Sequence, residues 1–168
     1  MKIALANYND ERQYGKDLPE VCDVPDLTGF AENGLGVAAF EKEQTIGFLC
    51  CSAPFDNVFR ATDVRGFFSP MGANGAIGEN CSKIYASMYQ AAGEKWVKAG
   101  AVSHAIYLYA HDEELHTQFF RYGFGLRCLD AVRPMEQIDC GPCAGYEFAE
   151  LEECHLLSSS SGIVPPLL

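Results

Sequence analysis

A glycine-rich segment stands immediately before the clearest predicted helix of the chain. Residues 72–78 read GANGAIG, and apolar residues then recur at helical spacing from Ile84 to Trp96. The first N–H groups of a helix lack partners within the helix, and its dipole favours negative charge there. Glycines also let a backbone approach an anion closely. The segment is therefore either a phosphate cradle or a flexible surface loop. It is neither a Walker loop, since no Gly-Lys-Ser/Thr follows, nor a strict G-x-G-x-x-G fingerprint.

A second segment with chemical potential is LYAHDEELHTQFFRYGFG, residues 108–125. A strand-like end meets Asp112, which we expect to cap a short helix from Glu113 to about Tyr122. The acidic start of that helix is explained by the helix dipole without a functional role. His111 and His116 flank the helix start and lack the spacing of a helical metal pair. His111 is a candidate for orienting a substrate, although a solvated helix terminus is the simpler interpretation.

The elements around these segments alternate between strand and helix patterns. Helices are expected up to about Tyr14 and from Pro25-Asp26 to Asn33-Gly34. Residues 36–41 and 45–52 predict a β-hairpin. Further strands are expected at residues 62–69, 102–110 (buried on both faces), 126–133 and 146–151, with a helix between Asn80 and Gly100. This order predicts an α/β or α+β layered fold with a mixed sheet.

Composition limits the function classes. The chain has 168 residues, enough for one domain, and a net charge of −11 that disfavours nucleic acid as a ligand. An acidic surface attracts cationic substrates such as amines, although simple solubility also explains it. There is no apolar run long enough to span a membrane and no signal-peptide pattern, which predicts a cytoplasmic protein without a membrane partner.

Eight cysteines raise the alternative of a zinc or redox protein. Cys140 and Cys143 form a C-x-x-C, but no second pair follows at the usual spacing, and only Cys154-His155 lies nearby. In a reducing compartment cysteines are more often buried small hydrophobes. We therefore expect no metal, and metal analysis of the purified protein would test the alternative.

The order of these elements resembles the GNAT-type N-acetyltransferases over roughly residues 34–133. The resemblance rests on the hairpin GVAAFEKEQTIGFL, the strand RGFFSP, the segment GANGAIG with the helix IYASMYQAAGEKW, the strand HAIYLYA and the segment HDEELHTQFFRYGF. It implies a mostly antiparallel central sheet flanked by helices, with two central strands splayed apart. The acetyltransferase domain would cover residues 1–143, and residues 144–168 would form a closing strand and a poorly structured tail.

The resemblance also implies a function and a site. Acetyl-CoA would be the co-substrate, with its pantetheine arm between the splayed strands, and a small amine or an amino terminus would accept the acetyl group. Main-chain groups of one strand would bond the pantetheine amides, N–H groups of residues 74–78 would hold the pyrophosphate, and Asp112 stands at the family's Asn position. The implied cofactor-binding residues are Phe68, Ser69, Pro70, Asn74, Gly75, Ala76, Ile77, Gly78 and Asp112. A homodimer is a further implication.

The family's usual acid for the thiolate is a Tyr, and Phe119 stands at that position here. Phenylalanine cannot give a proton, so we assign the catalytic role to Tyr122, with Tyr109 as a second candidate. The family also usually begins with a strand before the first helix, whereas this sequence begins with the helix pattern. The alternative is therefore a non-catalytic acyl-CoA-binding or structural domain, such as a fragment of a tandem-domain protein.

Overall fold

The computed structural model describes residues 1–15, 17–20, 22, 24, 26–57, 64–131, 141 and 145. The chain divides into two units, Met1–Pro134 and Met135–Leu168, and the elements below all belong to the first. Cys140, Cys143 and the strand expected at residues 146–151 lie outside the described residues. The domain boundary expected after residue 143 therefore stays a prediction.

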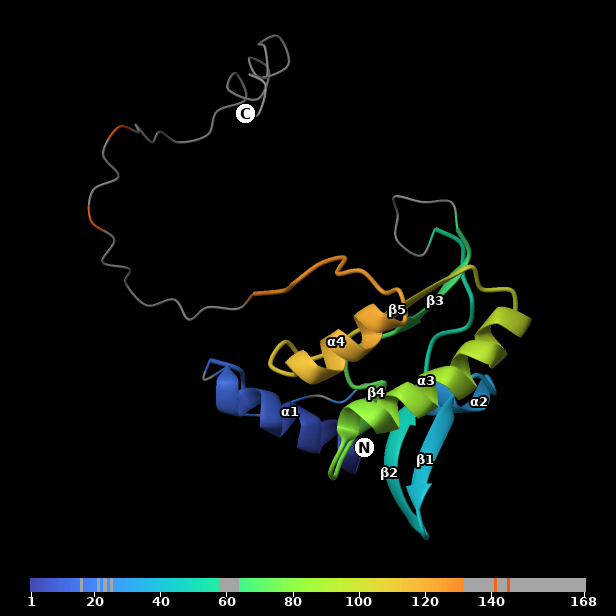
Figure 1. Ribbon diagram of the computed structural model, residues 1–168, viewed down its shortest axis with the longest axis horizontal. Helices are drawn as coiled ribbons and strands as arrows, with labels where there is room; N and C mark the ends of the chain where they lie inside the picture. Colours follow the sequence, from blue (N-terminus) through green and yellow to red (C-terminus); the bar gives the residue numbers. More distant parts are fainter. Residues whose placement is uncertain are drawn as a thin grey trace. The chain divides into compact units, whose positions relative to one another are not determined.

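The first unit has an α+β fold (Figure 1). Its elements follow the chain in the order α1 (Lys2–Tyr14), α2 (Thr28–Glu32), β1 (Val37–Glu41), β2 (Gln44–Leu49), β3 (Gly66–Ser69), β4 (Asn74–Ala76), α3 (Cys81–Lys98), β5 (Ser103–Ile106) and α4 (Glu113–Arg121). The predicted hairpin is confirmed as β1 and β2, which pair antiparallel around Lys42 and Glu43. The cap predicted for α4 is also confirmed, because Asp112 Oδ1 accepts the Leu115 N–H at 2.9 Å.

The strands form two small sheets, and the chain changes sheet between β3 and β4. Strand β3 pairs in parallel with β5, and the last bond of this pairing runs from the Tyr107 N–H to the Ser69 carbonyl at 2.9 Å. After a turn over residues 70–73, β4 pairs antiparallel with β2 instead, which gives the order β1-β2-β4. Because β5 ends at Ile106 and β4 turns to β2, the two paths diverge beyond Ser69.

The buried side chain of Asn74 joins the two paths at the point where they separate. Its Nδ2 donates to Ser69 Oγ and to the Tyr107 carbonyl, both at 3.1 Å. Its Oδ1 accepts from the Tyr85 hydroxyl of α3 at 2.9 Å. One carboxamide therefore replaces the ladder hydrogen bonds that the diverging backbone cannot make, and no polar group of this set is left without a partner.

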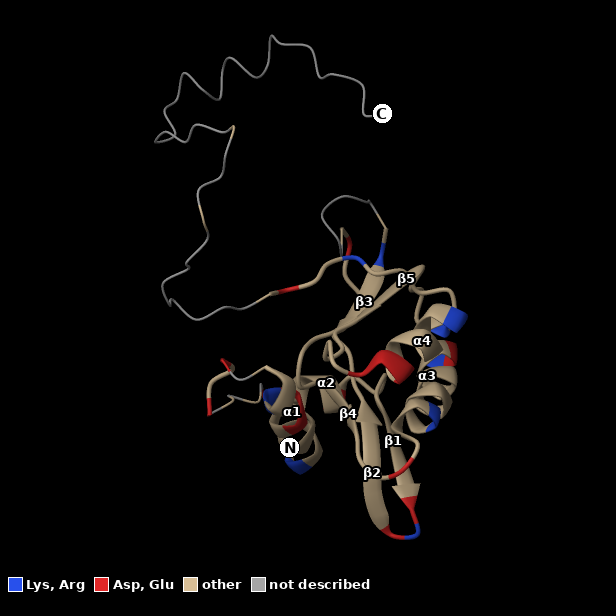
Figure 2. Cartoon of the chain, turned by 60° about the vertical axis from the view of Figure 1, so that its left-hand side comes forward, with Lys and Arg blue, Asp and Glu red and all other residues tan. Residues whose placement is uncertain are grey.

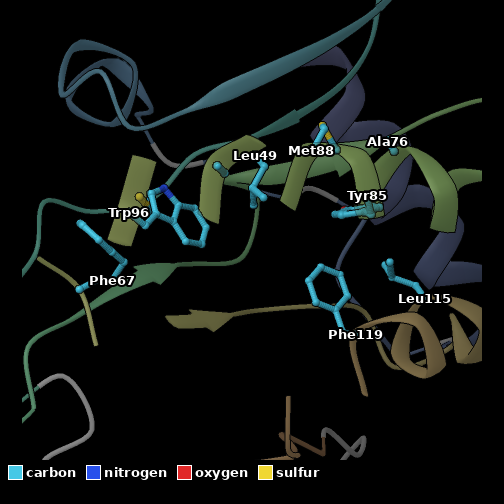
Figure 3. Packing of buried hydrophobic residues seen from close by; sticks show 11 residues of the cluster. Leu49, Phe67, Ala76, Tyr85, Met88, Trp96, Leu115 and Phe119 are labelled. Atoms are coloured by element: carbon cyan, nitrogen blue, oxygen red, sulfur yellow. The ribbon is translucent and has the colours of Figure 1, made fainter. Parts of the chain in front are cut away.

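Helix α3 supplies more of the buried core cluster than any other element, through Tyr85, Met88, Ala92 and Trp96 (Figure 3). Trp96 is fully buried beside Phe67 of β3, and its Nε1–H donates to the Leu35 carbonyl at 3.0 Å. At the other end of the helix, Tyr85 meets Phe119 of α4 edge to face, with ring centroids 6.1 Å apart. This core fixes α3 and α4 around the point where the strands diverge.

Two expectations about strands need correction, and one further strand was not predicted. The strand predicted at residues 126–133 is not formed over residues 126–131, where Leu126 and Leu129 are exposed and lack a partner strand among the described residues. The strand predicted at 102–110 is shorter and only half-buried, because its second half leaves β3. Strand β4 was not predicted, since its residues lie in the glycine-rich segment and carry no strand-forming side chains.

Replacing Asn74 tests the importance of this side chain. We expect Asn74→Ala to lower the free energy of unfolding by about 2–4 kcal/mol, because it leaves the buried Tyr85 hydroxyl and the Tyr107 carbonyl without partners. Urea unfolding measures the change, and the exposed Asn9→Ala is the matched control, with a change within about 0.5 kcal/mol. Because Tyr85 and Asn74 share a hydrogen bond, Tyr85→Phe should lower the free energy of unfolding less in the Asn74→Ala background than in the wild type.

Candidate functional site

A narrow cleft lies where the strands have diverged. It encloses about 70 Å3, whereas a small-molecule pocket usually holds roughly 300–1,000 Å3. Its lining comes from α1, β4, α3, the segment after β5 and the start of α4. The lining residues are Asn7, Asp10, Ala76, Cys81, Tyr85, Tyr109, His111, Asp112 and Leu115. As it stands, the cleft has room for water but not for a cofactor arm.

Helix α1 contacts the edge of β4 that faces away from β2. Asn7 Nδ2 donates to the Ala76 carbonyl at 2.7 Å, and its Oδ1 accepts the Ala76 N–H at 3.0 Å. This reciprocal pair copies the bonding of a neighbouring strand. The approach is close, because a Cβ at Gly75 would lie 2.6 Å from Asn7 Oδ1 and 2.9 Å from Ile3 Cγ2. Glycine at position 75 therefore allows α1 to reach the strand.

His111 attaches the far end of α1 to the segment after β5. Its Nδ1 is hydrogen-bonded to Glu11, its Nε2 lies 3.1 Å from Asp10 Oδ2, and Tyr14 stacks on the ring at 4.6 Å. Burial by itself lowers the pKa of His111, but the hydrogen bonds and charges of Glu11 and Asp10 outweigh it and raise the pKa above the ordinary value. Two carboxylate partners fit an imidazolium, which donates from both nitrogens.

The cleft is electrostatically negative. Acidic residues stand at the N-terminal end of α4, and α1 carries Asp10 and Glu11 as well as Lys2 and Arg12 (Figure 2). Ser82 in the first turn of α3 donates to Glu114 Oε1 at 2.6 Å, so a carboxylate already lies at this helix start. Burial first, and then the charges of Asp112, Asp10 and Glu114, raise the pKa of Cys81. The Cys81 thiol is therefore a neutral lining group rather than a thiolate nucleophile.

The main-chain groups expected to bind pantetheine amides already have partners. The Phe68 N–H and carbonyl bond Ser52, at 3.3 Å and 2.9 Å. The Ser69 carbonyl accepts from Tyr107, and the Pro70 carbonyl accepts the Ala73 N–H at 3.0 Å. The backbone groups of this path that face the cleft are instead those of Ala76, which bond a side chain of α1. The candidate amide-binding edge therefore lies further along the chain than the sequence indicated.

The predicted phosphate cradle is also partly occupied. Asn74, Gly75 and Ala76 are buried in β4, and the Ile77 N–H donates to the Ile46 carbonyl of β2 at 2.9 Å. Gly78 is exposed, with φ +98, and stands beside the start of α3. Of the nine predicted cofactor-binding residues, the cleft lining contains Ala76 and Asp112. Any anion at α3 would meet the segment from Gly78 onward rather than the whole glycine run.

The tyrosine assignments separate clearly in the structure. Tyr122 does not line the cleft; its hydroxyl accepts from Gln90 Nε2 at 3.1 Å. Phe119, at the position of the family's acid, is buried in the core. Tyr109 does line the cleft, and burial raises the pKa of its hydroxyl, which stays protonated as a hydrogen-bond donor.

Two residues of the cleft lining, Asn7 and Asp10, were not predicted from the sequence, because no local signal links α1 to β4.

Comparison with protein-family models, curated proteins and solved structures gives no match for this chain. Among the described residues, no group of His, Cys, Asp and Glu side chains is arranged to hold a metal ion. No described helix is both long and apolar enough to cross a membrane. The fold and the cleft are therefore the features of this chain that bear on its function.

The contacts of His111 predict a pH-dependent stability. A histidine with a raised folded-state pKa stabilises the fold fully below its unfolded pKa of about 6.5, and this contribution is lost as the pH rises through the folded value. We expect His111→Gln to destabilise by roughly 1–2 kcal/mol at about pH 5.5 and by clearly less at about pH 8.5. Urea unfolding at both pH values measures this.

His116→Gln is the control for that series, because no carboxylate contact of His116 occurs within the described part of the chain. It measures the cost of replacing a histidine that lacks the two carboxylate contacts. Equal effects of His111→Gln at the two pH values would show that His111 does not bind α1 as an imidazolium.

Proposed function

We propose that the chain is an N-acetyltransferase of the GNAT type, which transfers acetyl from acetyl-CoA to an amine. One observation carries the proposal. Two parallel strands, β3 and β5, pair over a short length and then part, and a cleft opens at the point of parting beside the N-terminus of α3. A gap of this kind accepts an extended chain with amide groups, while the start of the helix suits an anion.

The cleft offers groups for each part of the reaction. The amine nitrogen attacks the thioester carbonyl, a tetrahedral oxyanion forms, and the C–S bond then breaks. The proton lost by the amine has a carboxylate acceptor in Asp112, and the leaving thiolate has a donor in the Tyr109 hydroxyl. The negative charge of the cleft favours a cationic acceptor, so a small amine or an amino terminus fits best.

The alternative function is a domain of the same type that binds an acyl-CoA without catalysis, or serves a structural role. Three observations favour it: Phe119 is buried, Tyr122 bonds Gln90 outside the cleft lining, and Glu114 already lies at the start of α3. A pyrophosphate at this helix start would have to displace that carboxylate. Binding and turnover must therefore be measured separately.

The first experiment measures binding and then turnover on the wild-type chain. If the proposal is correct, acetyl-CoA raises the thermal midpoint, because a ligand that binds only the native state stabilises it. A thiol-release assay with a panel of small amines and amino-terminal peptides then detects transfer. A midpoint shift without thiol release would favour the non-catalytic alternative. Absence of both shift and release at millimolar acetyl-CoA, in the wild type and in a variant that frees the Ala76 backbone groups, would eliminate both functions.

Substitution of the two tyrosines identifies the donor to the thiolate. We expect Tyr109→Phe to lower kcat about 10- to 100-fold with little change in KM, because the hydroxyl acts on the leaving group rather than on ground-state binding. Tyr122→Phe is the matched variant, since its hydroxyl bonds Gln90 instead. A loss of kcat in Tyr122→Phe with full activity in Tyr109→Phe would return the assignment to Tyr122.

A further inference from the structure

Helix α1 occupies the one edge in the cleft that an extended ligand would need. On the edge of β4 that faces away from β2, the Ala76 N–H and carbonyl lie between Asn74 and the start of α3. Both of these groups bond the carboxamide of Asn7. A carboxamide presents one acceptor and one donor side by side, as two successive amide groups do along one edge of an extended chain. Asn7 thus takes the place of two successive amide groups of a ligand.

The contacts that hold α1 are mainly polar. One end is held by Asn7 on Ala76, and the other by His111 with Asp10, Glu11 and Tyr14. Ala4 and Tyr8 of the helix are also buried, and their exposure opposes release and favours the closed form. Water can satisfy the polar groups that the helix frees when it leaves.

The size of the cleft leads to the same conclusion. With α1 in place the cleft encloses about 70 Å3, well below the roughly 300 Å3 of the smallest usual ligand pockets. Asn7 and Asp10 form the α1 side of its lining. Ligand entry therefore needs α1 to move, unless the ligand avoids the cleft altogether.

We propose that α1 is an internal competitor for the amide-binding edge of β4, and that an acyl-CoA enters the cleft only when Asn7 releases Ala76. The inference rests on the proposed function and adds a regulatory element to the same site. The Ala76 backbone would recognise an extended chain with secondary amides, which either a pantetheine arm or a peptide supplies. The apparent affinity for the acyl-CoA is the intrinsic affinity of the open form multiplied by the fraction of molecules in which α1 is released.

The test compares two substitutions of the same kind on one helix. Asn7→Ala removes both bonds to Ala76, whereas Asn9→Ala removes an exposed carboxamide. By calorimetry, we expect Asn7→Ala to bind acetyl-CoA about 3- to 30-fold more tightly than the wild type and Asn9→Ala to match the wild type. Pantetheine should show the same gain, and ADP, which lacks the amide arm, should show none. A short N-acetylated peptide amide is the remaining probe, and a gain for it alone would make a peptide the ligand.

Hydrogen exchange on the wild type gives a second readout that needs no variant. Saturating acetyl-CoA should speed exchange in residues 2–14 while the Ala76 N–H stays protected by the ligand. Slower exchange in α1 on binding would overturn the inference, because the helix would then close over the ligand rather than compete with it.

The outcomes separate this inference from the proposed function. Equal affinity of Asn7→Ala and the wild type for acetyl-CoA would overturn the competition by α1 and leave acyl-CoA binding intact. Binding by neither protein at millimolar concentration would overturn both. Tighter binding by Asn7→Ala alone supports both, including the case in which the wild type binds too weakly to measure.

Discussion

The buried carboxamide of Asn74 is the interaction on which the arrangement of the cleft depends. A β-sheet cannot part its strands without leaving backbone groups unpaired, and a buried carbonyl without a donor is costly. Here the Tyr107 carbonyl would be left without a hydrogen-bond donor, and Asn74 Nδ2 supplies one. The same side chain also bonds Ser69 and accepts from Tyr85 of α3, so the parting point is tied to the core helix. Because one residue carries these three bonds, the chain can pass from one sheet to the other within the turn at residues 70–73.

The parting creates a second requirement, which α1 meets. Beyond Asn74, the Ala76 N–H and carbonyl face an open edge, and an open edge is a place where another chain can pair. Asn7 covers that edge from a helix rather than from a strand. A helix can reach so far only because Gly75 has no Cβ, which would lie 2.6 Å from Asn7 Oδ1. The glycine in the predicted phosphate segment therefore has a packing role that does not depend on a ligand.

Local patterns predicted the elements of this fold much better than the contacts between them. The hairpin of β1 and β2, helix α3 and the Asp112 cap each follow from residues that are close in the sequence, and each is confirmed. Strand β4 could not be predicted, because Asn-Gly-Ala has low strand propensity and is held by pairing with β2. The contact of Asn7 with Ala76 could not be predicted either, because a side chain that bonds a distant backbone group leaves no periodic pattern in the sequence. The candidate amide-binding edge lies at Ala76 rather than at Phe68–Pro70 for the same reason, because contacts with distant segments decide which partner each backbone group has.

The charges of the cleft link the position of α1 to the kind of molecule that can enter. With α1 bound, Asp10 and Glu11 bring two carboxylates to a region that already has Asp112 and Glu114 nearby, and the chain as a whole carries −11. A polyanionic cofactor would be repelled by this closed form. If α1 leaves, both of its carboxylates leave with it, and His111 remains on the segment after β5. Loss of those partners would lower the pKa of His111 again, so the open cleft becomes less negative without acquiring a fixed positive charge. If the proposed function is correct, release of α1 would free the amide edge of β4 and take away the carboxylates of Asp10 and Glu11, while Asp112 would remain to meet a cationic amine.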